Sequence, residues 1–293
     1  MRKPSSLVLD RKGVESPVAI TATVLVVCLL VVAGIALAES FSGGNDDGVR
    51  TAVNGDLVEV DFIGTFDNGR VFDTSLWSIA SDDDISKSFS FTKKPQSQYV
   101  PIEFTIGDGR LLAKFESAVI GLAVGETRTI SLTPEEGYGL VPASLLRSHD
   151  LIEELPLRET MNLTEFEVFF GEAAANGLVV NHPVYGWDVV VETYSPNVDE
   201  VVVRNQPVQG MKYWSYGDRD KSQGWDVRVN AVESDSITIE NLLNSSMVNS
   251  VRGVDADGEP FFLHAIEDGK MYFKYSVERV GQNLNFVITL VNL

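Results

Sequence analysis

The spacing of hydrophobic positions changes several times along this chain of 293 residues. Residues 18–38 form an apolar run without a charged side chain. Segments 57–62, 102–106 and 127–132 are rich in apolar and β-branched residues, and the last two alternate as strands do. A spacing of three or four residues, typical of a helix, occurs at 112–122. The pattern therefore predicts an apolar N-terminal segment followed by an α+β region that is mostly β.

The apolar run has the length of a transmembrane helix, because about 20 apolar residues cross the hydrocarbon core of a bilayer. Basic residues precede it and acidic residues follow it, so the positive-inside rule places the N-terminus in the cytoplasm. We expect residues 1–17 to be cytoplasmic, residues 18–38 to be a single-pass anchor in the cell membrane, and residues 39–53 to link it to an extracytoplasmic domain. A cleaved signal peptide is the alternative, since Ala36-Leu37-Ala38 resembles a cleavage site.

The charge balance of the chain restricts its partners. Lys and Arg number 23 against 42 Asp and Glu, which gives a net charge of -19. Such a chain repels phosphate backbones, so no nucleic-acid partner is expected. Cys28 is the one cysteine, which excludes an intramolecular disulfide and a cysteine metal site, and the three histidines lie far apart. The sequence therefore predicts no metal site and no cofactor.

Two internal segments and the C-terminus carry the residues of most chemical interest. Residues 55–75 contain two strands joined at Asp67-Asn-Gly69, a hairpin turn signal. Residues 101–126 pass from a strand into a short helix, which Gly121 is placed to end. A turn at 134–139 follows the strand at 127–132. These elements predict a twisted sheet wrapped around one short helix.

The same segments resemble the FKBP family of peptidyl-prolyl cis/trans isomerases. Residues 55–75 match its pattern V-x-Y-x-G-x-x-x-[DN]-G-x-x-F-D-[ST]-S, and residues 101–126 match its helix G-[FW]-E-x-A-[LV]-x-G-M-x-V-G-E. Residues 134–139 match P-E-x-A-Y-G, and residues 284–290 match the last strand, L-x-F-x-V-x-L. The matched parts cover about a third of the chain. The resemblance implies an FKBP-like twisted antiparallel sheet around one short helix, and isomerase activity.

The resemblance also implies an apolar substrate pocket. Its catalytic positions fall on Phe72, Asp73, Phe115 and Tyr138, and its substrate-binding positions fall on Phe62, Ile102, Leu111, Leu112 and Phe286. Phe62 stands where the family usually has a tyrosine whose hydroxyl helps to hold the aspartate. We therefore expect Asp73 to be less rigidly held than in the family, and the reaction to be slower.

About 140 residues separate Gly139 from Asn283, where the FKBP fold needs only a short loop. The SlyD-like branch of the family resembles this plan, because it places a chaperone insert-in-flap domain there. The branch's N-H-P-L-A-G turn is replaced by Ser276-Val-Glu-Arg-Val-Gly281. The expected domains are residues 54–140 and 276–293 for the FKBP part, and residues 141–275 for an inserted β-rich domain with a chaperone role.

The insert contains an internal repeat. Gly186-Trp-Asp-Val recurs as Gly224-Trp-Asp-Val, and each copy precedes a second strand that ends in asparagine. Two hairpins of one design predict a small antiparallel sheet or barrel. Trp187 and Trp225 are expected to anchor its core, with a client-binding groove as the alternative.

Two functions fit these features. The first is an isomerase that assists the folding of exported proteins, with the insert holding unfolded or proline-containing polypeptides. The second is a non-catalytic chaperone or protein-binding scaffold anchored at the surface. Asp73 and Tyr138 favour the enzyme, whereas Phe62 and the large insert leave the scaffold open.

Overall fold

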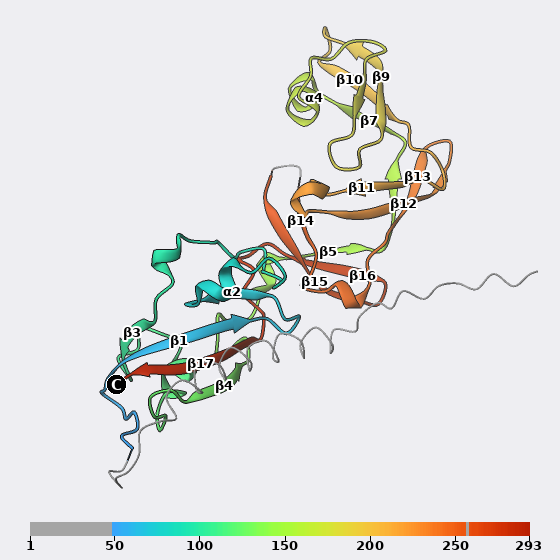
Figure 1. Ribbon diagram of the computed structural model, residues 1–293. Coiled ribbons are helices and arrows are strands. Elements are labelled where there is room, and N and C mark those ends of the chain that lie inside the picture. The colour runs from blue at the N-terminus through green and yellow to red at the C-terminus, as the bar shows by residue number, and fades with distance from the viewer. Residues whose placement is uncertain (1–48, 256–257) are drawn as a thin grey trace, which may run out of the picture. The chain divides into compact units, whose positions relative to one another are not determined.

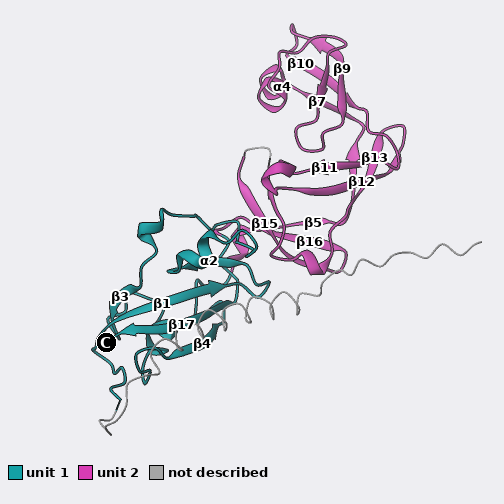
Figure 2. Cartoon of the chain, viewed as in Figure 1, with its two compact units in different colours: residues 1–140, 278–293 teal, residues 141–277 magenta. Residues whose placement is uncertain are grey.

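The computed structural model describes residues 49–255 and 258–293. The predicted cytoplasmic segment, the predicted anchor at 18–38 and most of the predicted linker therefore lie outside the described residues. Within the described part of the chain, no helix is both long enough and apolar enough to cross a membrane. The chain divides into two compact units (Figure 2), unit 1 up to Leu140 with Glu278–Leu293, and unit 2 at Val141–Val277.

Unit 1 is built on one antiparallel sheet of five strands (Figure 1). Its order is β2-β1-β17-β4, and β3 pairs with the part of β1 that β2 leaves free. The strands are β1 (Leu57–Thr65), β2 (Val71–Thr74), β3 (Ile102–Thr105), β4 (Thr127–Leu132) and β17 (Leu284–Asn292). The predominance of strands and the small number of helices agree with the predicted α+β class.

The core of unit 1 follows from the alternation of its last strand. Leu284, Phe286, Ile288 and Leu290 are all buried on one face of β17, and the residues between them are more exposed. Burial of one such side chain contributes about 1.5–3 kcal/mol. Phe115 from helix α3 (Ala113–Ser117) packs into the same cluster. The predicted arrangement of a twisted sheet on one short helix is therefore present.

The helix is shorter than the apolar spacing at 112–122 predicts. Regular α-helix ends at Ser117, and turns continue to Gly121, which has a left-handed φ of 81°. The amide of Gly121 donates to the carbonyl of Ala52 (2.8 Å) instead of continuing the helix. Tertiary hydrogen bonding therefore replaces the last helical turn, although Val119 and Leu122 stay buried. A second short helix, α2 (Trp77–Ser81), follows β2.

Unit 2 contains three four-stranded antiparallel sheets. The first has the order β7-β10-β9-β8, the second β11-β12-β13-β6 and the third β14-β15-β16-β5. The strands are β5 (Leu146–Asp150), β6 (Ile152–Pro156), β7 (Arg158–Met161), β8 (Val179–Asn181), β9 (Asp188–Ser195), β10 (Glu200–Asn205), β11 (Lys212–Ser215), β12 (Trp225–Val232), β13 (Ser236–Asn241), β14 (Arg252–Val254), β15 (Pro260–Glu267) and β16 (Lys270–Lys274). Helix α4 (Leu163–Phe170) begins with a capping box and ends at Gly171.

The repeated tryptophans are structural. The indole Nε1 of Trp187 donates to Oδ1 of Asn205 (2.8 Å), and that of Trp225 donates to Oδ1 of Asn241 (2.9 Å). Both indoles are almost fully buried, with 2% and 4% exposure. The tryptophans are therefore core anchors, as predicted.

The structure reveals that the β15–β16 hairpin is a third copy of the same design, which the repeat visible in the sequence did not indicate. Each hairpin ends with an amide that donates to a leucine carbonyl at about 2.8–2.9 Å, from Asn205 to Leu157, from Asn241 to Leu151 and from Tyr275 to Leu145. The accepting leucines recur every six residues. In the third copy Leu263 pairs with Phe273 as Val191 pairs with Val203 and Val229 pairs with Ile239. Counted from this pair, Glu259 and Tyr275 occupy the tryptophan and asparagine positions. Unit 2 is therefore a threefold internal repeat.

Candidate functional site

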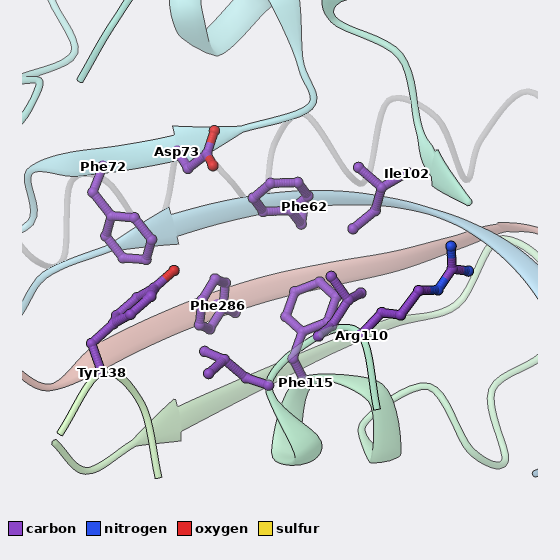
Figure 3. Close-up of a pocket in the computed structure, with 10 residues that line it drawn as sticks. Phe62, Phe72, Asp73, Ile102, Arg110, Phe115, Tyr138 and Phe286 are labelled. Carbon is purple, nitrogen blue, oxygen red and sulfur yellow. The ribbon is translucent and has the colours of Figure 1, made fainter. Parts of the chain in front are cut away.

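A pocket of about 360 Å³ opens in unit 1. Its volume lies in the range of small-ligand sites, and most of its lining is apolar. The structure brings all nine residues named from the sequence around it, together with Arg110, which the sequence did not indicate. Figure 3 shows Tyr138 and Phe72 at one end of the pocket and Ile102 and Arg110 at the other.

Aromatic rings form the floor of the pocket. The Phe115 ring meets Phe286 edge to face with centroids 5.1 Å apart, and it meets Phe62 in the same way at 5.8 Å. Phe72 meets Phe286 edge to face at 5.5 Å. The quadrupoles of aromatic rings favour edge-to-face packing, and this packing fixes the orientations of the rings. The floor is therefore one rigid cluster contributed by β1, β2, β17 and α3 (Figure 3).

A glycine makes this cluster possible. Gly64 of β1 pairs with Asp73 on one side and with Phe286 on the other. A Cβ at Gly64 would lie 2.7 Å from the Phe72 ring and 3.0 Å from the Phe286 ring, too close for a side chain. The rings of the pocket floor therefore occupy the space that the missing side chain leaves.

The segment before α3, which carries Leu111 and Leu112, is held by a buried carboxylate. Glu116 is 3% exposed, and its Oε1 accepts from the Leu111 amide at 2.8 Å. Its Oε2 accepts from the amides of Gly107 (3.2 Å) and Gly109 (3.3 Å). Three backbone donors on one carboxylate keep this wall of the pocket in place, and Glu116 was not among the residues predicted to form the site.

Asp73 is half-buried at the pocket. Its Oδ1 accepts from the amide of Thr74 at 2.9 Å, and no hydroxyl holds it from position 62, which is phenylalanine. The β1–β2 connection is fixed by its neighbours instead, because Thr74 Oγ1 donates to the Phe62 carbonyl (2.8 Å) and Ser75 Oγ accepts from the Phe62 amide (2.9 Å). The backbone that carries Asp73 is thus well anchored even though its carboxylate has few partners.

Tyr138 stands at the rim with 43% of its surface exposed. Its turn is closed by the amide of Gly139, which donates to the Pro134 carbonyl at 2.7 Å. Arg279 Nη1 lies 3.4 Å from the Tyr138 hydroxyl and is its hydrogen-bond donor. The Tyr138 hydroxyl therefore keeps its proton available for a ligand in the pocket.

Replacing Glu116 by glutamine should loosen the wall before α3. The glutamine NH₂ is a donor and would face backbone donors, so at least one amide loses its acceptor, at a cost of about 1–3 kcal/mol. We expect amide hydrogen exchange at residues 107–112 to quicken by about fivefold to a hundredfold. Glu103→Gln, at an exposed position of β3, is the matched control. Unchanged exchange in Glu116→Gln would contradict this role of the carboxylate.

Comparisons with known proteins agree with this geometry. A family model described as FKBP-type peptidyl-prolyl cis-trans isomerase matches residues 48–152. A short-type peptidyl-prolyl cis-trans isomerase of Methanocaldococcus jannaschii is 41% identical over 113 residues, 39% of this chain and 62% of that protein. FK506-binding protein 2 of Candida glabrata is 33% identical over 89 residues, 30% of this chain and 51% of that protein.

A trigger factor of Burkholderia lata is 35% identical over 96 residues, 32% of this chain and 16% of that protein. The chain thus spans less than two thirds of the length of these curated relatives. The matched residues contain β1 to β4, α3 and every residue of the pocket except Phe286. Residues 48–152 are therefore similar to an FKBP-type peptidyl-prolyl cis-trans isomerase domain.

Proposed function

We propose that this protein catalyses cis/trans isomerisation of X–Pro bonds in polypeptide clients, with the pocket of unit 1 as its active site. The observation that carries the proposal is the aromatic floor with two polar groups at its edge, the Asp73 carboxylate and the half-exposed Tyr138 hydroxyl. In this role Phe72, Asp73, Phe115 and Tyr138 contact the reacting amide. Phe62, Ile102, Leu111, Leu112 and Phe286 enclose the proline ring.

The pocket suits the physical chemistry of the reaction. Rotation about an X–Pro bond has a barrier of about 20 kcal/mol, which arises from amide resonance. Water stabilises the planar amide through its charge separation, and an apolar pocket withdraws that water. The twisted amide is less polar, so it is stabilised relative to the planar one. No covalent bond forms or breaks, and a thousandfold acceleration needs only about 4 kcal/mol.

Each polar group then has a defined task. The Tyr138 hydroxyl donates a hydrogen bond to the carbonyl oxygen of X, which orients the amide across the rings. The Asp73 carboxylate lies beside the carbonyl carbon, where it interacts with the amide dipole as the bond twists. Because Phe62 stands in place of tyrosine, the Asp73 carboxylate is less restrained, and we expect the isomerisation to be slower but still catalysed.

Peptide assays test the active site. Tyr138→Phe removes one hydrogen bond to the substrate, and we expect kcat/KM to fall about tenfold on an X–Pro tetrapeptide. Asp73→Ala should also lower kcat/KM. Tyr272→Phe removes a hydroxyl of unit 2 and should leave the rate at the wild-type value. A folded wild-type protein with no activity would refute the proposed isomerase function and favour a non-catalytic scaffold.

We propose that residues 18–38 anchor the protein in the cell membrane, with both units outside the cytoplasm. The support is the charge-free apolar run and the basic residues before it. In this position the protein would assist the folding of exported chains.

Membrane fractionation tests the anchor. Leu29→Arg with Leu30→Arg places two charges at the centre of the run, each costing about 2.5–3.5 kcal/mol of insertion free energy. The wild-type protein should stay with membranes after an alkaline wash, and the double variant should not. Leu7→Arg, in the predicted cytoplasmic segment, is the control and should remain membrane-bound. A mature N-terminus directly after Ala38 would instead establish a cleaved signal peptide.

We also propose that unit 2 acts as a SlyD-like chaperone insert that holds unfolded chain. The support is its place in the sequence between two parts of the FKBP-type fold, and its exposed apolar side chains. Val168, Val198 and Ile152 are 81%, 70% and 59% exposed. A client held by unit 2 stays at a high effective concentration for the pocket of the same molecule.

Deletion of residues 141–275 separates the two activities. We expect the shortened protein to isomerise a tetrapeptide and to lose suppression of aggregation of an unfolded client. Full-length Tyr138→Phe should behave in the opposite way, since it retains unit 2. Equal suppression of aggregation with and without residues 141–275 would refute the chaperone role of unit 2.

A further inference from the structure

The pocket rim carries a cation that belongs to the return segment, residues 278–283, between unit 2 and β17. The Arg279 guanidinium lies 5.3 Å from the centroid of the Phe72 ring and 5.6 Å from that of the Tyr138 ring. Its Nη1 is 3.4 Å from the Tyr138 hydroxyl, and its Nη2 is 3.4 Å from the Phe72 carbonyl oxygen. The charge therefore lies between two residues that line the pocket.

The backbone on both sides of Arg279 is fixed. Glu278 is 2% exposed, and its carboxylate accepts from the amides of Phe89 (3.3 Å) and Ser90 (2.7 Å). Two residues after Arg279, the amide of Gly281 donates to the carbonyl of Gly139 at 2.8 Å, next to Tyr138. The position of the guanidinium at the rim is thus built into the fold.

Arg279 differs from the other cations near the pocket in having no counter-charge. Arg110 is paired with Asp108 at 2.6 Å, and Lys114 is paired with Glu136 at 2.8 Å. Within the described residues no carboxylate lies within 4.0 Å of a nitrogen of Arg279, whose contacts are a hydroxyl, a carbonyl and two ring faces. A guanidinium has five N–H donors, so most of them remain available. Although the chain has a net charge of -19, the guanidinium of Arg279 forms no ion pair within the described residues and can bind an anionic ligand.

We propose that Arg279 forms a carboxylate subsite, which makes the pocket select X–Pro bonds in which X is Asp or Glu. The inference rests on the proposed isomerase function and specifies its substrate class. When Tyr138 donates to the carbonyl oxygen of X, the side chain of X branches from the adjoining carbon atom. The Arg279 guanidinium lies beside the Tyr138 hydroxyl, so it is within reach of the side chain of X. A guanidinium binds a carboxylate through two parallel hydrogen bonds.

The test compares three tetrapeptides, with Glu, Gln or Lys before proline, on the full-length protein. Glutamine has the shape of glutamate without its charge, so the ratio of kcat/KM for Glu-Pro over Gln-Pro isolates the charge. We expect a ratio of about three to ten at low salt, consistent with a partly exposed ion pair. The Lys-Pro peptide should be slower than Gln-Pro. High salt should reduce the ratio, because it screens the attraction.

Variants assign the preference to this residue. In Arg279→Gln the Glu-to-Gln ratio should fall to about one, and Arg279→Lys should retain part of it, because lysine keeps the charge and loses the planar fork. Arg50→Gln removes an exposed cation of unit 1 that is paired with Asp56, and it should keep the wild-type ratio.

A wild-type ratio near one, or a ratio that persists in Arg279→Gln, would overturn the carboxylate subsite and leave the isomerase intact. If the folded protein isomerises none of the three peptides, both the proposed isomerase function and the carboxylate subsite are refuted.

Discussion

The pairing of β17 between β1 and β4 is the interaction on which the rest of the molecule depends. It joins the C-terminal residues to strands more than 150 residues earlier, through Phe62 opposite Ile288 and Phe286 opposite Ile130. Without β17, strand β4 has no partner in the described sheet, β1 keeps only β2 and β3, and the pocket loses the Phe286 ring. The chain must therefore return from unit 2 to complete unit 1. The entropy of closing a loop grows only slowly with its length, so a long insertion is compatible with this closure.

The pocket combines rigidity in its apolar part with freedom in its polar part. Gly64 leaves room for the Phe72 and Phe286 rings to meet, and Glu116 fixes the wall before α3 through three backbone amides. Among the described residues, the Asp73 carboxylate accepts a hydrogen bond only from the amide of Thr74, and 43% of the surface of Tyr138 is exposed. This division suits a reaction whose barrier is lowered mainly by withdrawing water from the amide. The rings must be in place beforehand, whereas the polar groups follow a dipole that rotates.

The sequence predicted what local patterns encode. The strands of unit 1 were predicted from local alternation and turn signals, and the residues around the pocket were named from contiguous motifs that resemble the FKBP family. Arg110 and Arg279 were missed, since their place at the rim comes from tertiary folding and no residue type or spacing marks it. That the third hairpin of unit 2 repeats the other two was missed, because Glu259 and Tyr275 replace the tryptophan and asparagine that made those two copies visible. The helical spacing at 112–122 predicted burial correctly but overestimated the helix, since the Gly121 amide bonds to Ala52 instead.

The return from unit 2 does more than complete the sheet. Within four residues it places a buried carboxylate, Glu278, on the amides of Phe89 and Ser90, a cation at the pocket rim, and the Gly281 amide on the turn that carries Tyr138. The residues that rejoin the sheet follow directly after the inserted unit in the sequence. In the proposed functions, substrate preference and client holding are specified by neighbouring stretches of one chain, and the aromatic floor is the part proposed to lower the barrier.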